Sequence, residues 1–226
     1  MGWNLSPRFS SSKVESGKIE DFIDIYEDRI SGWLLSPARS LLKIKDAGIA
    51  VTCLLVSYFE GFWQYRTGGD SRGKSDQFFR AAVSDVLPEI TIPPGFNPTF
   101  DIKTVQANYL ALVYADARCG LLHDGLIRKG ILIGRAPSYL ERAPMSISVH
   151  RDTGAVSFVL LDPEKLFEEI EKHHKRYCAS LREGKDPVLR ENFLRMWILR
   201  NTGGPSGAPA PPGADSGTKP VTPKGT

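Results

Sequence analysis

The chain has 226 residues, of which 41% are hydrophobic and 24% are charged, and its formal net charge at pH 7 is +3. This length allows one full-sized hydrophobic core, or at most two small ones. The hydrophobic and charged fractions are those of an ordinary globular protein. A net charge this small does not indicate nucleic-acid binding on its own, although a local basic patch can provide such binding.

The sequence gives no sign of secretion or of a membrane span. The first residues are polar and lack the apolar run of a signal peptide. The longest apolar run, Ile49–Phe59, has roughly half the length that crosses a bilayer. Cys53, Cys119 and Cys178 are odd in number and widely spaced, which is typical of neither a disulfide framework nor a zinc site. We therefore expect a cytoplasmic protein with no membrane contact.

The N-terminal half predicts a series of helices after a flexible leader at residues 1–17. From Lys18 onward, one helical face is apolar; it comprises Ile19, Phe22, Ile23, Tyr26 and Ile30. Gly32 is expected to end or interrupt this helix, and Ser36 to cap the next one with Pro37 in its first turn. Further helices are predicted at about 46–66 and 75–87, followed by an ordered, proline-rich loop at 90–101.

The C-terminal half mixes helices with a small β-element. A central helix is predicted at about 102–122, and residues 124–135 fit either a short helix or an extended chain. The alternating runs around Asp152-Thr153-Gly154 predict a β-hairpin at about 145–161. Helices are expected from Asp162-Pro163 to about Leu181 and again at 187–200. Residues 202–226 have the composition of a disordered tail. The fold class is thus mainly α, a helical bundle in one domain at 18–201 with a small C-terminal β-hairpin.

The central helix carries charged groups within an apolar surface, namely Asp116, Arg118 and His123. A buried charge without a partner costs several kcal/mol, so each of these groups requires a partner, water or a function. On a regular helix, Arg118 and His123 are about 140° apart. They meet only if the helix ends or bends, which Gly120 allows. If the helix stays regular, Asp116 and His123 share a face instead.

The segment from Tyr114 to Gly125, YADARCGLLHDG, contains an Arg, four residues and a His. With its helical setting over Lys18–Gly134, it resembles the HEPN family of helical ribonuclease-like domains. The resemblance implies a helical bundle that forms a homodimer, with Arg118 and His123 of both copies lining one cleft. It also implies RNA cleavage without a metal or other cofactor. In that chemistry His123 transfers protons, and Arg118 binds phosphate and stabilises developing charge.

One position departs from the family pattern. Nuclease-active members typically carry Asn, Asp or His directly after the Arg, whereas this chain has Cys119, a weak hydrogen-bonding group. One hypothesis is therefore an endoribonuclease of a defence or toxin type, with an antitoxin or other protein partner. A second is a non-catalytic module for dimerisation, RNA binding or partner binding. In a third, Arg118 only pairs with Asp116 or Glu60.

Other charged residues are candidates for supporting roles. Glu60 lies within an apolar helix and either orients Arg118 or His123 or faces solvent, while Asp116 and Cys119 lie within the motif. A track for the RNA backbone is expected at Arg128, Lys129 and Arg135. The basic run around His173 and His174 is interpreted as a solvated helix face, with phosphate contact as the alternative.

Overall fold

The structure is a computed structural model, and it describes residues 4–87, 101–135, 143–150 and 153–201. It confirms a mainly helical fold with a small β-sheet. In chain order the elements are η1 (Ser11–Ser16), α1 (Ile19–Arg29), η2 (Ile30–Leu35), α2 (Ser36–Leu41), α3 (Gly48–Thr67), α4 (Ser75–Val86), α5 (Ile102–Leu112), η3 (Val113–Asp124), β1 (Ile131–Ile133), β2 (Met145–Val149), β3 (Val156–Leu161), α6 (Pro163–Glu183) and α7 (Pro187–Asn201).

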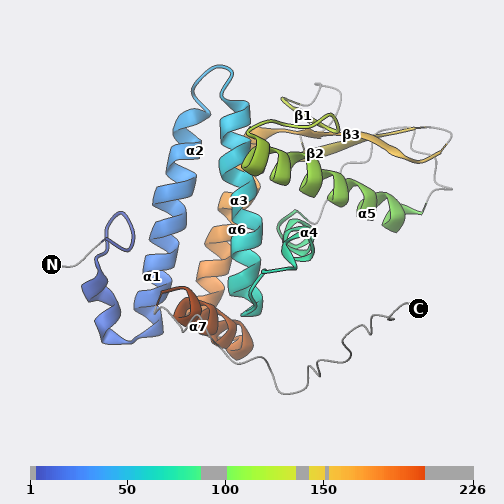
Figure 1. Cartoon of the computed structure of the whole chain (residues 1–226). Helices are drawn as coiled ribbons and strands as arrows, with labels where there is room; N and C mark the ends of the chain where they lie inside the picture. Colours follow the sequence, from blue (N-terminus) through green and yellow to red (C-terminus); the bar gives the residue numbers. More distant parts are fainter. Residues whose placement is uncertain (1–3, 88–100, 136–142, 151–152, 202–226) are drawn as a thin grey trace, which may run out of the picture.

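Helix α3 occupies the centre of the fold. Helices α2, α4, α6, α7 and the segment η3 all contact it, and α5 packs against β3 of the sheet (Figure 1). Figure 1 also shows α7 crossing one end of the helices, while the sheet and α5 lie toward the other end. This arrangement explains the apolar run predicted for α3, because a helix covered on most sides is hydrophobic on most sides.

The helix that begins at Ile19 does not end at Gly32, but its α-helical pattern is interrupted around this residue, from Ile30 to Leu35. Helix α1 continues through the π-helical turns of η2 into α2, with the Ser36 N–H donating to the Ser31 carbonyl oxygen five residues earlier. Ser36 is therefore inside a continuous helix and is no N-cap. Gly32 is required for a different reason, because a Cβ at this position would clash with the ring of Pro7.

The sheet has three strands in the order β1-β3-β2. Strands β2 and β3 pair antiparallel, with Ile147 opposite Val159, and form the predicted hairpin. Strand β1 adds to β3 in parallel, with Ile131 opposite Val159. Residues 131–133 therefore adopt the extended alternative that the sequence left open. Ile131, Ile147 and Val159 are all buried, so one face of the sheet belongs to the core.

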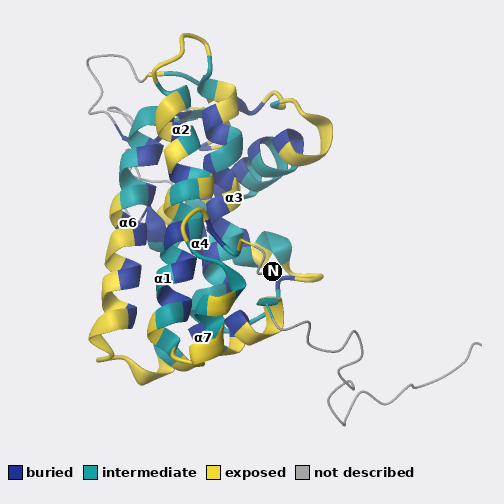
Figure 2. Cartoon of the chain, turned by 90° about the vertical axis from the view of Figure 1, so that its left-hand side faces the viewer, coloured by how far each residue is buried: buried dark blue, intermediate teal, exposed yellow. Residues whose placement is uncertain are grey.

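The core is formed by one face of the sheet and by the inward faces of the helices, whose buried positions face the middle of the molecule in Figure 2. Trp197 of α7 stacks on Phe22 of α1 with ring centroids 5.1 Å apart, and this contact attaches the last helix to the first. Helix α6 begins where predicted, since the Asp162 carboxylate accepts hydrogen bonds from the N–H groups of Glu164 and Lys165. All three cysteines are free thiols.

Part of the expected flexible leader lies against α1. The buried carboxylate of Asp28 accepts hydrogen bonds from the backbone N–H of Arg8 at 2.8 Å and from its Nε at 2.6 Å. Burial alone would raise the pKa of Asp28, but the hydrogen bonds from Ser6 and Arg8 outweigh it and lower that pKa. The loop predicted at 90–101 lies almost entirely outside the described residues, and the tail predicted at 202–226 lies wholly outside them. None of the helices among the described residues has the length and apolarity needed to cross a membrane.

Candidate functional site

The structure brings Arg118 and His123 together on the segment η3. Their Nη1 and Nε2 atoms are 3.3 Å apart. The segment is π-helical, and its end is marked by the Gly125 N–H donating to the Gly120 carbonyl oxygen five residues earlier. In a π-helix, residues five apart lie nearly above one another, because the hydrogen bonds run from i to i+5. The helix therefore widens at the motif. Arg118 and His123 meet without the end or bend of the helix that the sequence led us to expect between them.

The widened helix is held by the chain that returns along it. The Leu126 N–H donates to the Gly120 carbonyl oxygen at 3.2 Å, and the Arg128 N–H donates to the Asp116 carbonyl oxygen at 3.3 Å. These donors come from outside the helix, and insertion of such groups disturbs the regular i to i−4 pattern. Gly120 permits the close approach, since a Cβ there would lie 2.6 Å from the Leu126 carbonyl oxygen. Gly120 thus positions the motif through packing against the returning chain.

Glu60 of α3 forms an ion pair with Arg118, with Oε2 and Nη2 2.7 Å apart. The two side chains are 16% and 17% exposed, so water screens the pair only partly. Burial alone would raise the pKa of Glu60 and lower that of Arg118. Hydrogen bonds from Ser71, Ser75 and Arg118 outweigh burial at Glu60 and lower its pKa, whereas Glu60 raises the pKa of Arg118. Both side chains are therefore charged at neutral pH.

The contact with Arg118 restricts the role of one ring nitrogen of His123. A guanidinium group carries only donors, so a hydrogen bond between the two side chains requires the His123 Nε2 to be the acceptor. The tautomer that allows this bond has its ring hydrogen on Nδ1. His123 is exposed, whereas Arg118 is half-buried over the ring of Tyr114, with its guanidinium carbon 5.6 Å from the ring centroid. The site therefore presents an anchored cation and an open imidazole to solvent.

The other two motif residues have different surroundings. Cys119 lies beside the same guanidinium, with its Sγ 4.0 Å from Arg118 Nη1. Asp116 is directed away from the pair, and its Oδ2 accepts a hydrogen bond from the Gly130 N–H at 3.1 Å. Of the two carboxylates suggested as partners for Arg118, the structure thus selects Glu60. Asp116 instead fixes the chain just before β1.

The three residues expected to contact an RNA backbone lie together in a groove beside β1. Arg128 is paired with Asp124 at 2.6 Å, and Arg135 with Glu164 at 3.4 Å. Lys129 is exposed and has no ion pair within the described part of the chain. Neither Arg118 nor His123 lines this groove.

The interpretation of His173 and His174 as part of a solvated or phosphate-binding face was wrong, because both rings are buried. The Nδ1 of His173 is 2.9 Å from the Tyr58 hydroxyl oxygen, and its Nε2 is 3.3 Å from Asp85 Oδ2. The His174 ring lies against Tyr26 and Cys178. Burial lowers the pKa of both imidazoles, and that of His174 falls to about 4.

Within the described residues, no group of three or more His, Cys, Asp or Glu side chains is placed to hold a metal ion. Comparisons of the chain with protein-family models, with curated proteins and with solved structures found no match. The geometry of the site is therefore the basis for the proposals below.

Ser75, at the start of α4, is a member of the site that the sequence did not reveal. Its hydroxyl donates to Glu60 Oε2 at 2.8 Å. We expect Ser75→Ala to lower the free energy of unfolding by about 1 kcal/mol, the net contribution of such a hydrogen bond. The measurement is urea denaturation followed by tryptophan fluorescence. Ser57→Ala is the control, since this exposed hydroxyl donates only to the Leu54 carbonyl oxygen of its own helix. Equal stabilities of the two variants would contradict the role given to Ser75.

Proposed function

We propose that the chain is a HEPN-type helical protein that cleaves RNA without a metal ion, with Arg118 and His123 as its catalytic residues. The observation that carries this proposal is the 3.3 Å contact between these two side chains on a π-helical segment. Such segments are rare and are found frequently at functional sites. The Glu60 ion pair adds support, because it fixes the orientation of the Arg118 guanidinium.

The proposed chemistry uses His123 as a base and Arg118 as a cation. The neutral Nε2 of His123 takes the proton from a ribose 2′-hydroxyl, and the resulting oxygen attacks the adjacent phosphorus. A 2′,3′-cyclic phosphate forms as the bond to the 5′-oxygen breaks, and that oxygen takes up a proton to leave as a hydroxyl. Arg118 stabilises the charge on the phosphate oxygens. To do so, its Nη1 moves from His123 to the phosphate, which also frees the imidazole.

A second copy of the chain can supply the proton for the leaving oxygen. Leu122 and Leu126 flank His123 in the sequence and are 44% and 69% exposed. Association of two copies across this surface would remove both leucines from water, which favours a homodimer. It would also place two His123 side chains near one cleft, one as base and the other as acid. The homodimer is therefore part of the proposal.

Two observations favour a second candidate, a non-catalytic module for dimerisation or partner binding. Cys119 takes the place of the strongly hydrogen-bonding residue of active family members. In addition, Arg118 already has a carboxylate partner in Glu60. In this alternative the ion pair stabilises the packing of η3 on α3 and the motif has no substrate.

One assay distinguishes the two candidates. The purified protein is incubated with labelled single-stranded RNA and a chelator, and the ends of the products are analysed. We expect 2′,3′-cyclic phosphate ends, with cleavage reduced at least about a hundredfold in both Arg118→Ala and His123→Ala, in keeping with the loss of one catalytic group. Arg195→Ala, which changes an exposed arginine of α7, should cleave like the unchanged protein. Intact RNA at high protein concentration would exclude the nuclease and leave the non-catalytic module.

A further inference from the structure

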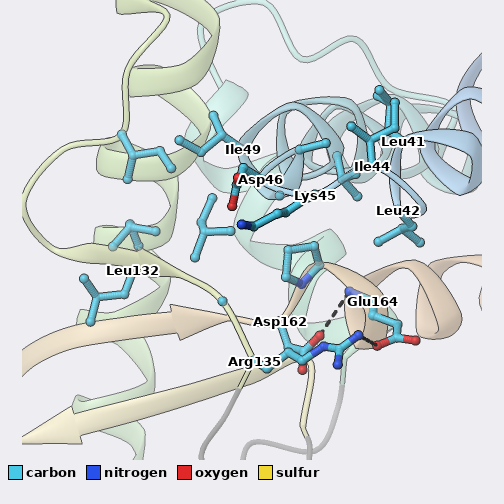
Figure 3. A pocket seen from close by; sticks show the side chains of 18 of the residues that line it. Leu41, Leu42, Ile44, Lys45, Asp46, Ile49, Leu132, Arg135, Asp162 and Glu164 are labelled. Atoms are coloured by element: carbon cyan, nitrogen blue, oxygen red, sulfur yellow. Dashed lines mark hydrogen bonds and ion pairs between the residues drawn. The ribbon is translucent and has the colours of Figure 1, made fainter.

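A groove of about 1060 Å³ lies between β1 and the corner that joins α2 to α3. One wall is formed by residues 41–49 and the other by residues 127–135. The start of α6 closes one end, and the side chains of both walls are seen in Figure 3. The groove is separate from the Arg118–His123 contact.

The charge of the lining is the first feature that indicates which kind of ligand the groove binds. Five basic side chains line the groove: Lys43, Lys45, Arg128, Lys129 and Arg135. The three carboxylates are Asp46, Asp162 and Glu164, and Asp162 is buried as the cap of α6. Lys43, Lys45 and Lys129 are exposed and form no ion pair with the described residues. Figure 3 shows Lys45 extended over the groove. The excess of positive charge favours an anionic ligand.

The second feature is a set of exposed aliphatic side chains in the groove. Ile44, Ile49 and Leu132 line the groove and are 58%, 52% and 48% exposed. Exposed aliphatic side chains gathered in one hollow are typical of a surface that a protein partner covers. The described lining contains no aromatic ring, whereas binding of single-stranded RNA commonly relies on stacking of bases on aromatic rings. The lining therefore suits an aliphatic polypeptide better than a nucleic acid.

The third feature is the edge of the sheet at β1, where no strand among the described residues pairs with its outer side. On the inner side of β1, the Val159 N–H donates to the Gly130 carbonyl oxygen, and the Gly134 N–H donates to the Leu161 carbonyl oxygen. Ile133, which follows Leu132 in the strand, therefore directs its N–H and carbonyl groups to the other side. That side borders the groove, since residues 131–134 line it. An extended peptide can bind there as an added strand.

We propose that this groove binds an extended segment of a partner protein in which acidic residues alternate with aliphatic ones. Its backbone pairs with β1 at Ile133, its aliphatic side chains cover Ile44, Ile49 and Leu132, and its carboxylates face the lysines. The alternation follows from the period of two in a strand, which directs successive side chains to opposite sides. The chain's own residues 202–226 do not fit, because they are rich in proline and contain Lys219 and Lys224 but only one acid, Asp215.

Fluorescence anisotropy with a short labelled peptide of alternating Glu and Val tests the proposal on the full chain. We expect saturable binding that weakens at least tenfold when alternate backbone nitrogens of the peptide are methylated, because this removes the strand hydrogen bonds. Binding should also weaken at least tenfold in Lys43→Glu/Lys45→Glu. The matched control is Lys103→Glu/Lys185→Glu, which makes the same change of charge at exposed lysines outside the groove and should bind normally.

The other outcomes overturn the proposal. Equal binding of the methylated peptide excludes pairing with β1, and no binding at about 1 mM peptide excludes this ligand class. If single-stranded RNA binds and loses affinity in Lys43→Glu/Lys45→Glu while the peptide does not bind, the groove belongs to nucleic acid. Circular dichroism and the melting temperature of each variant show whether it is folded. The readout is independent of RNA cleavage, so failure of this proposal and failure of the nuclease proposal are distinguishable.

Discussion

Gly120→Ala should lower the free energy of unfolding by about 2 kcal/mol and abolish the RNA cleavage proposed above. Alanine is favoured over glycine within a helix by up to about 1 kcal/mol, so propensity alone predicts stabilisation. The new Cβ, however, would lie 2.6 Å from the Leu126 carbonyl oxygen, which is backbone and cannot rotate away. Either the returning chain moves or η3 tightens, and both changes separate Arg118 from His123. Overpacking of this kind costs about 1–3 kcal/mol.

Gly61→Ala provides the matched control for this prediction. Gly61 lies within α3, and a Cβ at this position meets nothing within 4 Å. The same substitution should therefore stabilise the protein by about 0.5–1 kcal/mol. Urea denaturation gives both free energies, and ¹⁵N NMR of the imidazole reports whether the hydrogen bonding of His123 changes. A Gly120→Ala protein as stable as Gly61→Ala, with an unchanged His123 spectrum, would contradict the role of the close approach.

Sequence patterns predicted the helices because most of them bury a single apolar face. The spacing of Ile19, Phe22, Ile23 and Tyr26 matches the turn of an α-helix, and the Asp162-Pro163 start of α6 is a local signal. The π-helical segments have no comparable signal, because they depend on what packs against the helix. Gly32 accommodates Pro7, and Gly120 accommodates Leu126, and neither contact is visible in local spacing.

The candidate site was predicted only in part, for similar reasons. The motif indicated Arg118 and His123, but whether Glu60 or Asp116 pairs with Arg118 depends on how α3 and η3 pack. The basic neighbours of His173 and His174 suggested a surface position. A stronger signal was present, since these residues continue the buried spacing of α6, which comprises Leu166, Phe167, Ile170, Tyr177, Cys178 and Leu181. Lys43 and Lys45 were missed because only the tertiary fold places them opposite β1.

The buried ring of His174 should make the protein less stable as the pH falls below neutrality. The ring is 1% exposed, and burial lowers its pKa to about 4. In the unfolded chain, a histidine has a pKa of about 6.5. Below that pH the unfolded chain binds a proton that the folded chain does not. The free energy of unfolding therefore begins to fall near pH 6.5 and continues to fall down to about pH 4. Between about pH 7.5 and 5, the expected loss is about 2 kcal/mol. Burial also lowers the pKa of His173, so this residue adds to the loss of stability.

Urea denaturation at several pH values across this range measures the effect, and His174→Gln identifies its source. The variant can be less stable at every pH because it loses packing against Tyr26 and Cys178. The informative quantity is therefore the slope of unfolding free energy against pH, which should be smaller than in the unchanged protein. Glu60 and Asp28 do not produce this slope, because their lowered pKa values cause losses only as the pH falls through and below the ordinary carboxyl range. An equal slope in both proteins would show that His174 is protonated in the folded state as readily as in the unfolded chain.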